Sequence, residues 1–421
     1  MNTICNFADI DTYLLYYIDI KTILSLRQLS RNQCILMDNL VFIKELYTLK
    51  QNHPNIKQYQ IIDYAAEYNY ISLIQWINDS INPFIYSYLA IDCAAAYGNI
   101  DVLNWFDKSY HKFIYTEETI ICASECGNVE ILEWFDTSDY EFIYTKKAID
   151  LAAANNHEHV LDWFSKSDYE FIYTKKAINL AASKGYIEVL KWFSMSYYDF
   201  KYSKRAIDLA AQNGHINVLD WFSKSNYEFK YSCNAIDMAA LCRNIDVLNW
   251  FNNSTYEFKY TEKSYNSAAM YGNTQILDWF HTTGYKMNYR SMVDLAVENN
   301  QPNVLEWIKI NIPEFTNKKS DISTAARLGN MKVLQWYKNN GLEFKYNKDK
   351  IFAHNPNKCI KVLQWFQDNN LEITCQGDAI ISCDRKVLDW LKKNNVEITY
   401  NKYAMYKYND DTRNWLKENN Y

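Results

Sequence analysis

The sequence predicts an all-α solenoid of about 13 short helix–turn–helix repeats with short links, preceded by an N-terminal helical module. Three observations carry this prediction. All 13 tryptophans recur at a nearly fixed period, small and turn-forming residues keep a constant register to them, and 48% of the 421 residues are hydrophobic. A period between 20 and 50 residues is typical of repeated units that bury their apolar faces against one another.

The tryptophans set the register of the array. Their first seven intervals are 29 residues long, and the next five are 28, 29, 29, 25 and 25. We expect the indole rings to form a structural spine between repeats, so that truncating one buried indole costs about 3–5 kcal/mol. The spine residues are Trp76, Trp105, Trp134, Trp163, Trp192, Trp221, Trp250, Trp279, Trp307, Trp336, Trp365, Trp390 and Trp415.

Each repeat is predicted to begin with a short helix, as residues 145–154 illustrate. Thr145 is expected to cap this helix, because its hydroxyl can accept a hydrogen bond from a free backbone N–H of the first turn. Ala152 and Ala153 are small enough to let neighbouring first helices approach closely. An Asp or Asn recurs within the first helices and is expected to form a structural ladder that bonds neighbouring backbone amides. This ladder contains Asp92, Asp150, Asn179, Asp208, Asp237, Asn266 and Asp294.

The turn and the second helix follow at constant spacing. A Gly or Asn, such as Gly127 or Asn156, stands where the first helix should end in the left-handed conformation, and Arg243 is the one exception in this register. The second helix carries apolar residues three and four positions apart, as at Val160, Leu161 and Phe164, which places them on one face.

The segments AAQNGHINVLDWF at 210–222 and AAAYGNIDVLNWF at 94–106 resemble the second half of an ankyrin repeat. The unit departs from that family by reading KAID at 147–150 where ankyrin repeats carry Thr-Pro-Leu-His. It is also shorter than the family's usual repeat of about 33 residues, so we expect stubby or single-strand links in place of β-hairpin fingers. The short repeats rich in Trp, Tyr and Asn resemble ankyrin proteins of amoebae and their giant viruses. The resemblance implies repeats over 51–340 and degenerate, capping repeats over 341–421.

Residues 1–50 do not follow the repeat, and their apolar pattern predicts three short amphipathic helices. The stretch from Asp19 to Arg31 resembles the central part of an F-box, although Phe7-Ala8 replaces the family's opening Leu-Pro. The resemblance implies docking onto a cullin-ligase adaptor. The docking residues would be Ile20, Ile23, Leu24, Leu26 and Leu29. The alternative is a helical cap that covers the apolar face of the first repeat.

One register of the links varies while the core register stays constant, and it predicts a partner-binding row. It reads Ile85, Ile114, Ile143 and Ile172, then Lys201, Lys230 and Lys259. In an extended segment these side chains point away from the flanking aromatic residues. We expect a partner protein along the concave face with an apolar patch followed by an acidic one. The alternative is that the isoleucines pack beneath neighbouring links and the lysines are merely solvated.

Basic pairs such as Lys146-Lys147 and Lys175-Lys176 also oppose the helix dipole at the starts of first helices.

Composition argues against other classes of protein. The net charge of −6 without a basic run argues against nucleic-acid binding, and no apolar run approaches the roughly 18 residues of a membrane span. Ten scattered cysteines are typical of reduced thiols and not of a metal site. We therefore expect a monomeric cytoplasmic protein, in the host cytoplasm if it is viral, without cofactor or metal. Because no phosphate loop or nucleophile elbow occurs, we expect no enzyme. It would either recruit substrates to a cullin-type ubiquitin ligase or act as a free-standing scaffold that binds a host factor.

Overall fold

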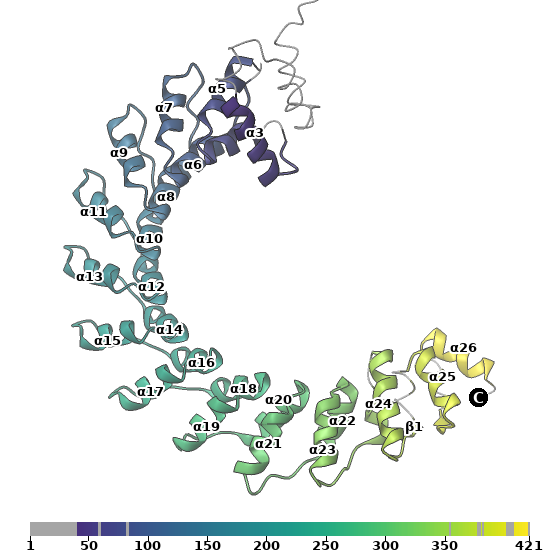
Figure 1. The fold of residues 1–421 in the computed structure, drawn as a ribbon. Coiled ribbons are helices and arrows are strands. Elements are labelled where there is room, and N and C mark those ends of the chain that lie inside the picture. Colours follow the sequence, from purple (N-terminus) through teal and green to yellow (C-terminus); the bar gives the residue numbers. More distant parts are fainter. Residues whose placement is uncertain are drawn as a thin grey trace, which may run out of the picture. The chain divides into compact units, whose positions relative to one another are not determined.

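The computed structural model describes residues 40–57, 60–80, 84–352, 355–376, 380, 383–400 and 408–419. The prediction of an all-α solenoid is confirmed, because helix follows helix through nearly all of these residues and neighbouring helices pack in chain order (Figure 1). The predicted docking residues of the N-terminal module, Ile20, Ile23, Leu24, Leu26 and Leu29, lie outside the described residues.

Each repeat between residues 61 and 339 is a pair of helices joined by a tight turn. The first helices are α4 (Ile61–Glu67), α6 (Tyr88–Tyr97), α8 (Glu117–Cys126), α10 (Lys146–Ala154), α12 (Lys175–Ser183), α14 (Lys204–Gln212), α16 (Asn234–Leu241), α18 (Glu262–Tyr271), α20 (Tyr289–Glu298) and α22 (Lys319–Leu328). The second helices are α5 (Ile71–Ser80), α7 (Ile100–Lys108), α9 (Val129–Thr137), α11 (Glu158–Lys166), α13 (Ile187–Met195), α15 (Ile216–Lys224), α17 (Ile245–Asn253), α19 (Thr274–Thr282), α21 (Pro302–Asn311) and α23 (Met331–Asn339).

Other elements flank these pairs. Helix α3 (Leu40–Asn52) packs against α5 before the first pair. After the last pair come the 3-10 helix η3 (Lys348–Lys350) and the helices α24 (Pro356–Asp368), α25 (Arg385–Lys393) and α26 (Asp410–Glu418). Strands β1 (Cys375–Gln376) and β2 (Ile398–Thr399) form a two-residue parallel ladder, with Cys375 opposite Ile398. In the last three tryptophan-bearing units the tryptophans lie on α24, α25 and α26, so these units differ from the regular helix pairs.

The core of each repeat is built as its periodicity predicts. In α10, Ala148, Ile149, Ala152 and Ala153 are fully buried, so α10 can pack directly against α8 and α12. Most second helices bury a pair of aliphatic residues, such as Val160 and Leu161, and an aromatic residue, and the tight packing of the first helices rests on the small size of the alanines. Within residues 84–352 the links contain no strand, which agrees with the expectation of stubby connections.

The turn register behaves as expected from backbone sterics. Gly127 has φ 82° and Asn156 has φ 65°, both in the left-handed region that these residues tolerate. Arg243 adopts the same conformation at φ 66°, although a side chain with a Cβ pays a steric cost there. The turn geometry is therefore imposed by the repeat and not by the residue that occupies it.

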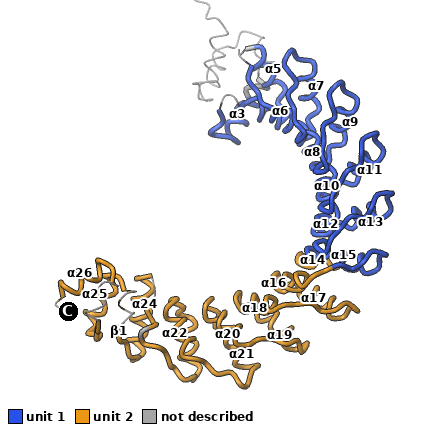
Figure 2. The backbone as a smooth tube through the Cα atoms, turned by 180° about the vertical axis from the view of Figure 1, so that it is seen from behind, with its two compact units in different colours: residues 1–210, 217–230 blue, residues 211–216, 231–421 orange. Residues whose placement is uncertain are grey.

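The chain divides into two compact units (Figure 2). Unit 1 comprises residues 1–210 and 217–230, and unit 2 comprises residues 211–216 and 231–421. In unit 1 the first helices α4 to α12 pack side by side in one row, and in unit 2 the helices α16 to α22 do the same. This division runs through the repeats, and the predicted boundaries at residues 50 and 340 stay predictions.

Candidate protein-binding surface

The links between residues 84 and 260 are held in place by aromatic clusters at the junctions between repeats. In the link before α10, the Phe142 ring stacks on Trp163 with centroids 5.5 Å apart and on Tyr169 at 4.1 Å. Tyr144 packs against Phe164, and its hydroxyl donates a hydrogen bond to the carbonyl of Glu170 in the next link. Both aromatic side chains of the link therefore face the packed side, and the residue between them is turned outward.

That outward position is the isoleucine register in the first part of unit 1. Ile85 is 52% exposed, and Ile114 and Ile143 are each 36% exposed. Ile172 is half-buried, so the fourth member of the row contributes less apolar surface. Three of the four predicted isoleucines thus present apolar surface to solvent, and packing beneath a neighbouring link does not bury them.

The lysines of the same register are exposed, but their charges are partly engaged. In unit 1, the Nζ atoms of Lys201 and Lys230 lie 4.8 and 5.4 Å from the ring centroids of Tyr173 and Tyr202. Lys230 also forms an ion pair of 3.2 Å with Glu228. In unit 2, Lys259 lies 4.6 Å from the centroid of Tyr231 and 3.8 Å from a carboxylate oxygen of Glu257. The expected row of free basic charge is therefore weaker than the sequence suggests.

A second basic row lies at the starts of the first helices in unit 1. Lys146, Lys147, Lys175, Lys176, Lys204 and Arg205 are all exposed in the first turns of α10, α12 and α14. Lys147 forms an ion pair of 3.0 Å with Glu118 on α8. Each pair begins three residues after the link residue Ile143, Ile172 or Lys201, so the two rows run beside each other.

The starts of these helices are tied down by the predicted Asp/Asn ladder. Asp150 of α10 accepts bonds from the backbone N–H and the hydroxyl of Thr174 at 2.7 and 2.6 Å, and Thr174 in turn caps α12. Asn179 holds Ser203 before α14 in a related way: its Oδ1 accepts the Ser203 backbone N–H at 3.0 Å, and its Nδ2 donates to the Ser203 hydroxyl at 2.9 Å. The expectation that these residues bond neighbouring backbone amides is confirmed at Asp150, Asn179 and Asp237.

The cap predicted at Thr145 is wrong in one respect. Thr145 occupies the N-cap position of α10, but its hydroxyl makes no capping bond, and this buried oxygen has no hydrogen-bond partner among the described residues. The physical reason lies one repeat earlier, where the ladder position is held by Ile121 and not by Asp or Asn. Without a carboxylate to orient it, the hydroxyl does not cap the helix.

The tryptophan spine also differs from its prediction. Among the described tryptophans Trp279, Trp307, Trp336 and Trp415 are buried, whereas the others are only half-buried. The fully buried aromatic residue in most repeats is the following one, such as Phe135 or Phe193. Consecutive residues on a helix differ in direction by about 100°, so in most repeats the second ring fills the core and the indole lies at its border.

The half-buried indoles have a polar role instead. The Trp192 Nε1–H donates to a carboxylate oxygen of Asp162 at 2.6 Å, and the Trp134 Nε1–H donates to Asn104 at 2.9 Å. In each case the acceptor is the residue directly before the tryptophan of the preceding repeat. The spine therefore consists of buried phenylalanines flanked by a ladder of indole hydrogen bonds.

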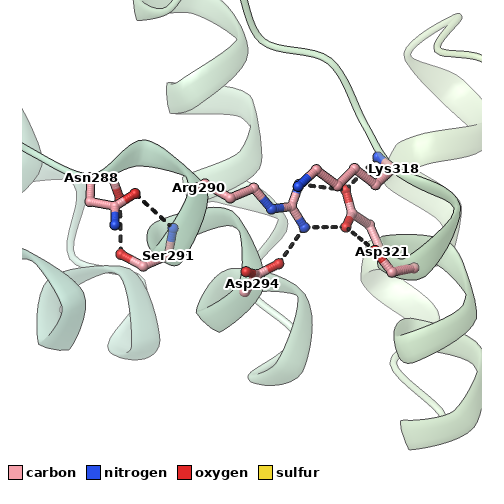
Figure 3. A network of polar contacts seen from close by, with 7 residues as sticks. Asn288, Arg290, Ser291, Asp294, Lys318 and Asp321 are labelled. Carbon is pink, nitrogen blue, oxygen red and sulfur yellow. Dashed lines mark hydrogen bonds and ion pairs between the residues drawn. The ribbon is translucent and has the colours of Figure 1, made fainter.

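In unit 2 one junction uses charge where the others use a hydroxyl (Figure 3). Lys318 stands at the cap of α22, so the ladder residue Asp294 meets no hydroxyl there. Arg290 of α20 supplies the donors: its guanidinium contacts Asp294 and forms two bonds with the buried Asp321, one of them 3.1 Å long. Asp321 also accepts the Lys318 backbone N–H at 2.8 Å. The pairing of Arg290 with Asp321 gave no sequence signal, because Arg290 falls in the register of Lys146, Lys175 and Lys204, and nothing in that register indicates a carboxylate partner.

A cavity of about 310 Å³ lies between the C-terminal ends of α16 and α18 in unit 2. Its lining includes Leu241, Arg243, Tyr271 and Asn273. This cavity is shared between two consecutive repeats. Arg243, the single arginine in the turn register, is one of its lining residues.

Two other features, a metal site and a membrane-spanning helix, are not found among the described residues. No group of three or more His, Cys, Asp or Glu side chains is placed to hold a metal ion in the part of the chain that the structure describes. In the same residues no helix has the length and apolar character required to cross a membrane. His157 and His159 are adjacent rings with centroids 5.5 Å apart, and the Nε2 atom of His159 lies 2.8 Å from the carbonyl oxygen of Gly127. The expectations of no enzyme, no metal and no cofactor stay predictions.

No protein-family model matches this chain, and no curated protein matches it. The resemblance to ankyrin repeats over 51–340 and to an F-box within residues 1–50 therefore rests on the sequence patterns alone.

Proposed function

We propose that the chain is a non-catalytic interaction protein whose ankyrin-type repeats bind another protein along the exposed link register of unit 1. The observation that carries this proposal is the row formed by Ile85, Ile114 and Ile143, which stays exposed although each neighbouring Phe and Tyr is packed. A repeat framework needs only its core and turns to fold. Apolar side chains that recur on its outer side in register are typical of a contact surface.

Two observations favour binding over chemistry at this surface. The row runs across several repeats, because an equivalent link residue recurs in each of them. The cap residues beside Ile85 and Ile114, Ser87 and Thr116, already bond to Asp63 and Asp92 of the preceding repeat, so they are committed to structure. Long surfaces of equivalent positions are how solenoids bind extended partners.

The proposal is tested by replacing the row without touching the core. We expect I85S/I114S/I143S to lose a partner captured by the wild-type chain, with unchanged circular dichroism and melting temperature. The control is M195S/Y197S/I310S, which removes three even more exposed apolar side chains outside the register. Capture should be monitored by affinity isolation and residue-level cross-linking. Equal capture by the row variant would overturn the proposal, and a large loss of melting temperature would show that the row belongs to the core.

A more specific form of this function is recruitment of substrates to a cullin-type ubiquitin ligase through residues 1–50. Its support is the F-box resemblance of the stretch from Asp19 to Arg31, and the alternative is a free-standing scaffold that binds a host factor. In the full-length chain, L24D/L29D should abolish capture of the cullin adaptor while the link partner is still captured. If wild type captures no adaptor, the scaffold form stands and the ligase form falls.

A further inference from the structure

The strongest charge feature of unit 1 is a cluster of cations, defined here as the basic strip: Lys146, Lys175, Lys176, Lys201, Lys204 and Arg205. These side chains are exposed on three consecutive repeats. Within the described residues none of the six lies within ion-pair distance of a carboxylate, whereas Lys147 beside them is paired with Glu118. The whole chain carries 50 acidic and 44 basic residues, so such an excess of positive charge is local and not a property of the composition.

The position of the basic strip makes this excess costly for the isolated protein. Five of its members lie in the first turns of α10, α12 and α14, where the helix dipole is positive and favours acidic side chains. The equivalent first turn of α8 carries Glu117 and Glu118, and that of α6 carries Tyr88 and Leu89. The repeat framework therefore accepts acidic or apolar residues at these positions, and stability alone does not account for the cations.

The apolar row beside the basic strip indicates what kind of chain it would hold. Ile143 and Ile172 precede Lys146 and Lys175 by three residues each, and Ile143 is exposed. On the other side of the isoleucines each link carries an exposed acidic residue, Glu141, Glu170 or Asp199. An apolar row with cations on one side and acidic groups on the other favours a partner whose apolar side chains lie on the row and whose acidic side chains point toward the cations. It fits a polypeptide with alternating apolar and acidic side chains.

Resting on the proposed protein-binding function, we infer that unit 1 binds an extended acidic peptide segment with an apolar residue at every third position. Packed helices lie about 8–10 Å apart, and a polyproline-II chain rises about 3.1 Å per residue with three residues per turn, so every third side chain returns to the same face. Three residues of such a peptide therefore match one repeat. Its apolar side chains would contact the isoleucines, and its carboxylates would meet the basic strip.

The inference can be tested with defined peptides on the full-length protein. Fluorescence anisotropy should show binding of (Leu-Glu-Glu)₅, with a dissociation constant that rises at least tenfold in K146Q/K175Q/K176Q/K204Q/R205Q. The matched control K108Q/K166Q/K224Q removes exposed lysines at the ends of α7, α11 and α15 in the same unit and should bind as wild type. Raising the salt concentration should weaken binding to wild type more than to the five-fold variant, because ionic contacts are screened.

Further probes distinguish the modes of failure. A peptide with Leu at every fourth position, or (Ser-Glu-Glu)₅, should bind at least fivefold more weakly than (Leu-Glu-Glu)₅. The inference would be overturned if those peptides bound as tightly as (Leu-Glu-Glu)₅, or if the five-fold variant bound (Leu-Glu-Glu)₅ as tightly as wild type does. Tighter binding of a 15-nucleotide polyuridine RNA than of the peptide would also overturn it. If capture of the cellular partner depends on Ile85, Ile114 and Ile143 but not on the basic strip, the proposed function stands and only the acidic-peptide assignment falls.

Discussion

At the scale of single residues, the consecutive aromatic pair of each second helix divides two tasks. Phe193 is 1% exposed and fills the layer between helices, whereas the half-buried Trp192 stacks on Phe171 and donates its N–H to Asp162. An indole must satisfy its N–H when it is removed from water, so a place at the border of the apolar layer suits it better than the centre. The phenyl ring has no such requirement.

This division predicts an order of mutational costs. F193A should destabilise the protein by about 3–5 kcal/mol, because it leaves a cavity in the core. W192F keeps a ring in the stack but leaves Asp162 without its donor, and should cost about 1.5–3 kcal/mol, the range for hydrogen bonds to charged groups. Its matched control is W134F, whose acceptor is the neutral Asn104, with an expected cost near 1 kcal/mol. Urea denaturation measures all three, and a W192F cost at or above that of F193A would contradict the assignment.

Sequence periodicity could predict the presence of this pair but not its division of tasks. Trp192 and Phe193 both fall on the apolar side of the helical pattern, and both are large. Only the position of the acceptor Asp162, 30 residues earlier, separates them. The turn register was easier to predict from the sequence. Gly127 and Asn156 tolerate the left-handed region that the turn requires, and this depends only on the local backbone.

At the scale of elements, most first helices begin where the previous repeat offers an acceptor. The carboxylates in this ladder are partly buried, and the burial raises the pKa of Asp63 and Asp92 even though hydrogen bonds from the next repeat oppose the shift. Asn179 performs the same task without a charge. Hydrogen bonding, and not charge, is thus what the position requires.

The contrast between two threonine caps gives a matched prediction. T174V should cost about 1–2 kcal/mol, because it removes a working cap and the hydroxyl donor to Asp150. T145V should be neutral within about 0.5 kcal/mol or slightly stabilising, because the Thr145 hydroxyl is buried without a partner. Thermal or urea unfolding compares the two. Equal costs would show that Thr145 caps α10 after all.

The ladder itself was predictable because one acidic or amide residue recurs per repeat, and its exception was not. The break at Ile121 becomes meaningful only once Asp92 is seen to hold Thr116, and Asp150 to hold Thr174, each 24 residues ahead. The bridge of Arg290 to Asp321 is equally hidden, since it replaces the ladder at a single junction. Local irregularities of this kind depend on contacts that a repeat pattern averages away.

At the scale of the whole molecule, the tyrosines make the stability of the folded protein depend on pH. The pKa of Tyr140, Tyr169 and Tyr173 is raised to about 12, first because burial disfavours the phenolate. Asp107 beside Tyr140 and Asp136 beside Tyr169 add to the shift. Tyr140 lies in the link before α10, and Tyr169 and Tyr173 lie in the link before α12, so alkali acts on both junctions together.

The protein should therefore lose stability on the alkaline side. The folded-state pKa values lie above the ordinary value of 10.0, so the folded state retains protons that the unfolded chain releases. The stabilisation is fully present below pH 10 and is lost as the pH rises from 10 towards 12. Denaturant titrations at several pH values should show this decline, with a shallower slope in Y173F than in wild type. A free energy of unfolding that is flat up to pH 12 would contradict the shifts.

The repeat architecture has a consequence for how such a chain can change its length. The bonds between neighbouring repeats join residues at constant separations, 24 for the cap ladder and 26 for the tyrosine hydroxyls. A duplicated segment of 29 residues, inserted by unequal recombination at a link, brings its own donors and finds matching acceptors at both ends. A copy lost in the same way closes the gap with equivalent groups. Growth or shrinkage by whole units therefore needs no compensating mutation elsewhere, and the reach of the surface can be varied independently of its chemistry.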